Sequence, residues 1–171
     1  AQNTASRGKG GVKYWMHNNM ITINGQKMGK SLGNFITLDE LFTGNNAVLE
    51  QAYSPMTIRF FILQAHYRST LDFSNEALQA AEKGLKRILQ AAKDVKGLKV
   101  SSASAETAKE IAQLKENVYE ALCDDLNTPI ALSHLFDAVK IVNQVKDGKL
   151  AIGAQEKETL EFLLSTIAMD V

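Results

Sequence analysis

Two lysines three residues apart stand in a stretch of small residues that has the chemistry of a phosphate-binding loop. The stretch reads Gln26-Lys27-Met28-Gly29-Lys30-Ser31-Leu32-Gly33-Asn34, and its small residues let the backbone approach a ligand closely. A lysine ammonium group is a compact, mobile charge that suits a triphosphate and its departing pyrophosphate. The Ser31 hydroxyl can donate to a phosphate oxygen, and successive backbone N–H groups can form an anion nest. Lys27, Lys30 and Ser31 are therefore the candidate site residues, although a solvated surface loop can carry the same pattern.

The charge distribution supports phosphate contact in this part of the chain. The formal net charge of the 171 residues is zero, yet residues 1–37 hold five basic residues and no Asp or Glu. This first segment is a local cationic patch. The remainder is mildly acidic and predicts no overall attraction to a polyanion. The basic residues of the later stretch 83–93 are flanked by Glu82 and Asp94, so a solvated helix face is favoured there over an RNA contact.

The elements around the loop are predicted to be short. β-like segments at Val12–His17 and Met20–Ile23 bracket an Asn18-Asn19 turn, which predicts a hairpin or neighbouring strands. The Asn24-Gly25 pair marks a second turn just before Lys27. Thr37, followed three residues later by Glu40, forms a capping box that opens a short helix.

From about residue 54 the pattern becomes helical. Ser54-Pro55 and Thr128-Pro129 each place a capping residue before a proline at a helix start, and Ser74 caps a long helix. Apolar side chains at helical spacing predict further helices over Glu106–Cys123 and from Ala154 onward. Residues 96–104 are interpreted as a mobile linker. The expected fold is mainly α: an antiparallel bundle over 54–171, preceded by a small α/β segment over 1–53.

Other chemically suggestive residues have structural interpretations. Trp15 is expected to close a small β-layer, and His17 lacks a second ligand nearby. His66, Tyr67 and Arg68 would end a helix, where cations are favoured. The only cysteine, Cys123, lies in an apolar helical stretch and is expected in the core. The carboxylates of 124–125 read as part of an interhelical turn and N-cap rather than as a catalytic pair.

Four blocks of sequence carry a resemblance to known enzymes. Residues 27–31 resemble the KMSKS signature of class I aminoacyl-tRNA synthetases, with glycine at position 29 in place of the usual serine. Tyr14-Trp15-Met16-His17-Asn18 precedes this signature, and His66-Tyr67-Arg68-Ser69 follows it. The last block is Asp124-Asp125-Leu126-Asn127-Thr128-Pro129. In their order and approximate spacing, the four blocks resemble the cysteinyl-tRNA synthetases.

The resemblance implies roles for the residues of the signature. Lys27 and Lys30 would act in catalysis, with Lys30 the better candidate for contacting ATP phosphates. Met28 would anchor the loop by apolar packing, and Ser31 would support its geometry. Gly29 removes a hydroxyl and adds backbone freedom, so the loop is expected to be more mobile without ATP.

The resemblance further implies an enzyme that activates cysteine with ATP and Mg²⁺ and transfers the cysteinyl group to tRNA(Cys). Residues 1–53 would end its Rossmann-type catalytic domain, and residues 54–171 would form a DALR-like, tRNA-facing domain. The ligands of the family's zinc ion and its HIGH signature do not occur in this sequence and are expected elsewhere in a longer parent enzyme. The chain alone is therefore expected to be inactive.

Three alternatives remain open from the sequence: the cysteine ligase of mycothiol biosynthesis, another class I synthetase such as the methionine or arginine enzyme, and a helical scaffold without nucleotide function. No apolar run approaches the roughly 20 residues needed to cross a bilayer, so no membrane association is expected. A single cysteine suits a reducing, cytoplasmic compartment. The protein is expected to be a monomer, and no metal site is expected in this chain.

Overall fold

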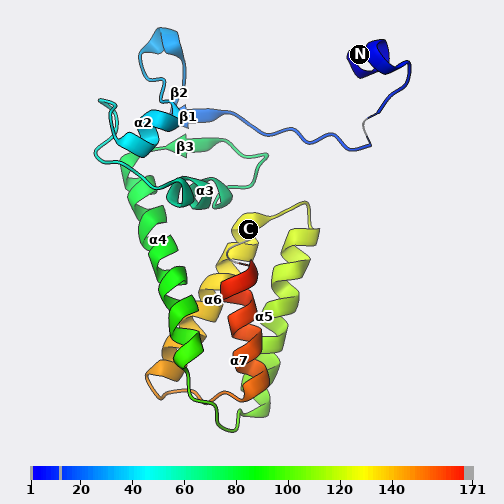
Figure 1. Ribbon diagram of the computed structural model, residues 1–171, viewed down its shortest axis with the longest axis vertical. Helices are drawn as coiled ribbons and strands as arrows, with labels where there is room; N and C mark the ends of the chain where they lie inside the picture. The colour runs from blue at the N-terminus through cyan, green and yellow to red at the C-terminus, as the bar shows by residue number, and fades with distance from the viewer. Residues whose placement is uncertain (1, 12, 168–171) are drawn as a thin grey trace.

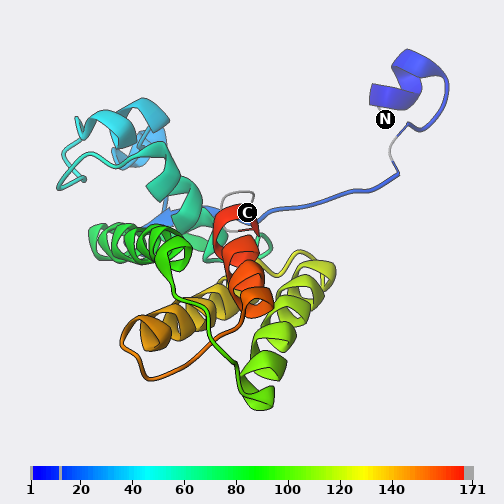
Figure 2. The same ribbon diagram turned by 60° about the horizontal axis from the view of Figure 1, so that its bottom comes forward.

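The computed structural model describes residues 2–11 and 13–167 and divides them into a small α/β layer and a helical bundle (Figure 1). The elements are α1 (Gln2–Arg7), β1 (Ile21–Ile23), β2 (Gln26–Lys27), α2 (Leu38–Thr43), α3 (Pro55–Leu63), β3 (Leu71–Phe73), α4 (Asn75–Asp94), α5 (Ala105–Cys123), α6 (Thr128–Lys146) and α7 (Ala154–Glu161). The expected mainly α fold is confirmed. The long helix α4 begins beside the small sheet and continues along the bundle, while α1 lies apart from the other elements in both views (Figure 1, Figure 2).

The sheet has three strands in the order β2-β1-β3. β1 and β2 form an antiparallel hairpin in which Thr22 pairs with Lys27. Asn24 and Gly25 connect them, with φ angles of 49° and 75°, and two positive φ angles are the geometry that Asn-Gly favours in a tight hairpin. β3 runs parallel to β1 and returns to it after two helices. This arrangement places Lys27 at the end of a strand that is held on a paired platform.

The strand predicted over Val12–His17 is wrong for the residues that the structure describes. Residues 13–17 form no strand, and Val12 lies outside the described residues. Trp15 is 74% exposed and stacks on His17 at 6.2 Å between ring centroids, so it does not close a β-layer. The hairpin instead forms at Asn24-Gly25, because that pair adopts the required left-handed backbone more readily than Asn18-Asn19.

Side-chain caps begin α2, α3 and α4 at the predicted residues. The Thr37 hydroxyl accepts the Glu40 backbone N–H, and the Glu40 carboxylate accepts the Thr37 N–H at 2.7 Å. The Thr37 N–H and the Thr37 hydroxyl both donate to the Glu40 carboxylate, and these two bonds, that of the backbone first, lower the pKa of Glu40. The Ser54 and Ser74 hydroxyls each accept a backbone N–H of the following helical turn and so cap α3 and α4. The cap of α6 is Asn127 rather than the predicted Thr128, because Thr128 is already the first residue of the helix.

Helices α4, α5, α6 and α7 run in alternating directions (Figure 1), which confirms the expected antiparallel arrangement for these four, while α3 lies across them. Their predicted apolar stripes supply the core, and α7 continues as a π-helix over Phe162–Ile167 that packs against α4 and α6. The side chain of Ile167, which the sequence placed in this stripe, lies outside the described residues. Fully buried side chains include Leu78, Ile111, Val118, Leu135, Val142, Leu160 and Leu163.

A close approach of helices ties the α/β layer to the bundle. Gly84 of α4 faces Phe60 of α3 and Phe136 of α6, and a Cβ atom at this glycine would lie 3.1 Å and 3.3 Å from those rings. The two phenyl rings meet edge to face at 6.4 Å between centroids, a favoured aromatic geometry. A side chain at position 84 would press on both rings, and the absence of one lets the three helices approach closely.

One expectation about the bundle fails, and another is not tested. The mobility expected of residues 96–104 stays a prediction, although the segment is attached to the bundle: Leu98 is buried, the Ser101 N–H donates to the Ile152 carbonyl at 2.8 Å, and the Lys157 ammonium donates to two carbonyls of the segment. Cys123 is exposed rather than buried. Cys123 is the last residue of α5 and lies beside the buried stripe that passes through Val118 and Ala121. The apolar character of the helix therefore did not determine whether the Cys123 side chain is buried.

Candidate functional site

The candidate loop leaves the sheet at Lys27 and returns to regular structure at α2. Gly29 is extended, with φ −164° and ψ 142°, and residues Lys30–Leu32 form a single 3-10 turn. Gly33 closes this turn with φ 68°, in the left-handed region that favours glycine. The small residues noted in the sequence thus shape the backbone of the loop and leave its charged side chains on the outside.

Asn34 holds the two ends of the loop together. Its side-chain oxygen accepts the Gly29 N–H at 2.9 Å, and its side-chain nitrogen donates to the Lys27 carbonyl at 3.1 Å. These two bonds restrain the backbone of the loop at Gly29, where a glycine would otherwise allow many conformations. The sequence analysis quoted Asn34 but gave it no role. The signal available there was the tendency of Asn side chains to bond nearby backbone groups in loops.

Met28 anchors the same loop from the apolar side. It is half-buried, packs against the hydrophobic core, and lines an apolar pocket of about 190 Å³ together with Ile58 and Ile62 of α3. The implied apolar packing of this side chain is therefore observed. With Met28 directed inward, the flanking lysines are left on the solvent side.

Lys27, Lys30 and Ser31 are all exposed. The Lys30 ammonium lies 5.3 Å from the centroid of the Phe35 ring, a cation–π contact that is weak at an exposed position. A phosphate oxygen offers this ammonium a stronger, charge-assisted hydrogen bond. The loop thus presents two exposed cations and a hydroxyl on a backbone that Asn34 and Met28 hold in place.

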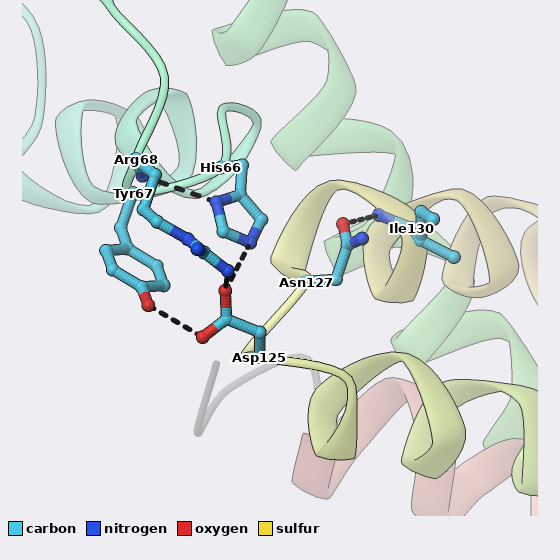
Figure 3. A network of polar contacts seen from close by, with 6 residues as sticks. All are labelled: His66, Tyr67, Arg68, Asp125, Asn127 and Ile130. Carbon is cyan, nitrogen blue, oxygen red and sulfur yellow. Dashed lines mark hydrogen bonds and ion pairs between the residues drawn. The ribbon is translucent and has the colours of Figure 1, made fainter. Parts of the chain in front are cut away.

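A second polar cluster joins the two halves of the chain (Figure 3). Tyr67 donates its hydroxyl hydrogen to a carboxylate oxygen of Asp125 at 2.7 Å, and Arg68 forms an ion pair with the other oxygen. His66 Nε2 lies 3.7 Å from that oxygen, while its Nδ1 accepts the Arg68 N–H at 3.3 Å. The sequence singled out both blocks but did not predict that they would meet.

The predicted capping role of these residues is wrong. Helix α3 ends at Leu63, and the side chains of 66–68 bond to the α5–α6 turn instead of to the last carbonyls of α3. The interhelical turn itself is confirmed, because residues 124–127 separate α5 from α6. Asn127 accepts the Ile130 N–H and starts α6.

Within residues 2–11 and 13–167, no group of three or more His, Cys, Asp or Glu lies in position to hold a metal ion. These residues therefore offer no ligand set for the zinc ion that the sequence resemblance implies. None of the described helices is long and apolar enough to pass through a membrane.

Comparison with known proteins matches both parts of the fold. A family model described as the tRNA synthetases class I (C) catalytic domain matches residues 1–83, a range that includes the loop. A DALR domain model matches residues 117–169. Across its whole length the chain is 57% identical to a cysteine–tRNA ligase of Parabacteroides distasonis. The chain belongs to the cysteinyl-tRNA synthetase family.

Other members of the family are also similar. The chain is 56% identical over its whole length to a cysteine–tRNA ligase of Bacteroides fragilis, and 41% identical over 98% of its length to one of Chlorobaculum tepidum. The matched segment covers 34% of the length of the Parabacteroides and Bacteroides relatives and 32% of the length of the Chlorobaculum relative. The chain thus spans about a third of the length of the curated relatives it matches. The resemblance inferred from the four sequence blocks is confirmed.

Proposed function

We propose that this chain supplies the ATP-contacting loop and the tRNA-bracing helices of a cysteine–tRNA ligase. The complete enzyme would activate cysteine as cysteinyl-adenylate and pass the cysteinyl group to tRNA(Cys). The observation that carries the proposal is the loop at residues 27–34, in which two exposed lysines stand on a backbone fixed by Asn34 and Met28. The names of the relatives support this function over the mycothiol-pathway ligase, another class I synthetase and a scaffold.

In the proposed reaction the lysines act on charge that moves during adenylate formation. The Lys27 and Lys30 ammonium groups bind the triphosphate, and Ser31 donates a hydrogen bond to it. As the bond to the departing pyrophosphate breaks, negative charge grows on the leaving group, and fixed cations stabilise that charge more than they stabilise bound ATP. The Lys30 ammonium leaves the Phe35 ring to make this contact, while Asn34 keeps the backbone in place.

The proposal extends to partners and compartment. The enzyme takes ATP together with Mg²⁺, works in the cytoplasm and acts as a monomer. Residues 54–171 face the tRNA, and residues 1–53 belong to the catalytic domain. That division stays a prediction, and β3, which follows residue 53, pairs with β1, which precedes it. The zinc ligands belong to other parts of the complete protein.

The test is cysteine-dependent ATP–pyrophosphate exchange by the full-length enzyme that carries this segment. Lys30→Ala is expected to lower the rate by roughly a hundredfold, because it removes one cation that stabilises the transition state. Lys109→Ala removes the same charge from the exposed side of α5 and is the matched control, expected to exchange normally. An unchanged rate in Lys30→Ala would contradict the assignment of the loop, and exchange driven by another amino acid would contradict the substrate.

A further inference from the structure

The Asp125 cluster connects segments that are far apart in sequence. Tyr67 and Asp125 are separated by 58 positions, and the cluster brings the turn after α3 onto the turn between α5 and α6 (Figure 3). Three side chains of the first turn face one carboxylate: a hydroxyl, a guanidinium and an imidazole. A convergence of this kind fixes the direction of approach between two segments more closely than a single ion pair does.

The backbone at this turn is bent so as to aim the carboxylate. Asp125 and Leu126 have φ angles of 57° and 55°, in the left-handed region that costs free energy for residues other than glycine. Backbone bonds hold the bend, because the Leu126 N–H donates to the Leu122 carbonyl and the Asn127 N–H donates to the Ala121 carbonyl. Leu126 is 49% exposed, so burial of its own side chain does not explain the conformation.

The turn at residues 66–69 is also bonded to the segment that leads into β1. The Asn19 N–H donates to the Tyr67 carbonyl at 3.0 Å, and the Asn19 side chain donates to the Arg68 carbonyl at 2.9 Å. The chain then passes through β1 to the hairpin that ends at Lys27. Asp72 of β3 holds that hairpin separately, by accepting the Thr22 hydroxyl and the Gly25 N–H. The strand–loop unit, which consists of β1, β2 and the loop at residues 27–34, is thus supported by Asp72 independently of the Asp125 cluster.

We propose that Asp125 is a positioning residue, which sets the bundle against the strand–loop unit through Tyr67 and Arg68 so that bound tRNA meets the catalytic part in the correct orientation. The inference rests on the proposed function, since it needs a loop that activates cysteine and helices that brace tRNA. A contribution to stability alone does not account for the cluster. Arg68 is 63% exposed and Asp125 39% exposed, and ion pairs at such positions add little to the free energy of unfolding.

The experiment compares two reactions of the enzyme. Aminoacylation of tRNA needs the bundle and the strand–loop unit together, whereas ATP–pyrophosphate exchange without tRNA needs the strand–loop unit but not the bundle. In the full-length enzyme, Asp125→Asn removes the charge and suits the left-handed backbone, because Asn tolerates that region. Arg68→Gln removes the opposite charge, and Tyr67→Phe removes only the hydroxyl. Asp124→Asn is the matched control, since Asp124 is exposed and forms no ion pair with any described residue. For each variant, kcat/KM of aminoacylation with respect to tRNA, the rate of ATP–pyrophosphate exchange without tRNA, and the midpoint of thermal unfolding are measured.

We expect Asp125→Asn and Arg68→Gln to lower kcat/KM for tRNA by roughly 2- to 30-fold, the range over which residues that couple two sites act. Exchange and the unfolding midpoint should stay near those of the unmodified enzyme. The double variant should be no worse than either single one, and Arg68→Lys should recover part of the loss by restoring the charge.

Two outcomes would overturn the inference, and they are distinguishable. If the unmodified enzyme shows cysteine-dependent exchange and Asp125→Asn charges tRNA normally, or loses both reactions together with thermal stability, Asp125 has no positioning role while the proposed function stands. If the unmodified enzyme shows no cysteine-dependent exchange, the proposed function fails and the inference fails with it.

Discussion

The loop at residues 27–34 and the bundle below it are held in place by opposite means. The bundle is fixed by many interchangeable apolar side chains, among which Leu135, Val142 and Leu160 have no exposed surface. The loop is fixed by one half-buried methionine and the two hydrogen bonds of Asn34. A buried apolar side chain can be replaced by another of similar volume at little cost. The Asn34 side chain must donate one hydrogen bond and accept another at fixed positions, so few other side chains can replace it. Changes in the bundle should therefore appear in stability, and changes in the loop in activity.

The largest effect is expected for Leu135→Ala in α6. Removing a fully buried leucine side chain leaves a cavity and should lower the free energy of unfolding by about 3 kcal/mol. Urea unfolding of the chain measures this loss. Ile130→Ala on the same helix is the matched control, because Ile130 is 47% exposed and should cost less than about 1 kcal/mol. Equal losses in the two variants would show that the bundle is not organised around this stripe.

A smaller effect, of the opposite kind, is expected for Asn34→Ala. Loss of its two hydrogen bonds frees the loop and should lower the rate of ATP–pyrophosphate exchange in the full-length enzyme about tenfold, because the lysines are then no longer held in one place for the transition state. The free energy of unfolding should stay within about 0.5 kcal/mol.

Gly29→Ala serves as the control for Asn34. Position 29 is extended, and an added Cβ would meet nothing nearer than 3.7 Å, so the Asn34 bonds survive in this variant. Normal exchange is expected from it. If Asn34→Ala lost stability instead of activity, the contrast between loop and bundle would not hold.

The smallest effect is a dependence of bundle stability on pH. Asp94 of α4 accepts hydrogen bonds from Lys146 of α6 and from Gln90, and these bonds, that of Lys146 first, lower the pKa of Asp94 from its ordinary value of 3.8. A carboxyl whose pKa is lower in the folded state stabilises the fold above its unfolded pKa, and this stabilisation is lost as the pH falls through the lowered value.

Asp94→Asn should therefore lower the unfolding midpoint slightly at neutral pH, with a difference from the unmodified chain that shrinks as the pH falls below about 4. Thermal unfolding followed across that range measures it. Asp147→Asn is the control, since Asp147 pairs only locally with Lys149. A difference that stayed constant at all pH values would exclude the ion pair as its cause.

The sequence predicted most of the fold because helices are specified by local patterns. Caps at Thr37, Ser54 and Ser74 and the apolar stripes of the bundle were read correctly, since both signals lie within a few residues of the element they define. Strand β3 was missed because three residues give no alternation to detect, and its partner β1 lies some 50 positions earlier. The position of Cys123 was wrong because a residue at a helix end can leave the stripe.

The candidate site was predicted in its charges and in the apolar anchor Met28, but not in its hydrogen bonds. Lys27, Lys30 and Ser31 carry recognisable chemistry, and their proposed roles stay predictions. For Asn34 the tendency to bond nearby backbone was a local signal, but it did not name the partners of the side chain. The meeting of Tyr67 with Asp125 joins segments 58 positions apart, and no local pattern contains that information.

The parallel pairing of β1 with β3 has a consequence for the order of folding. Ile21 pairs with Leu71 and Ile23 with Phe73, so the platform of the loop depends on contacts of long sequence separation, which form slowly because a long segment must first be ordered. On a ribosome the hairpin of β1 and β2 emerges well before its third strand. The lysines would therefore reach their final setting only after α3 and β3 have been synthesised, and a chain that stopped at residue 53 would leave β1 with an unpaired edge.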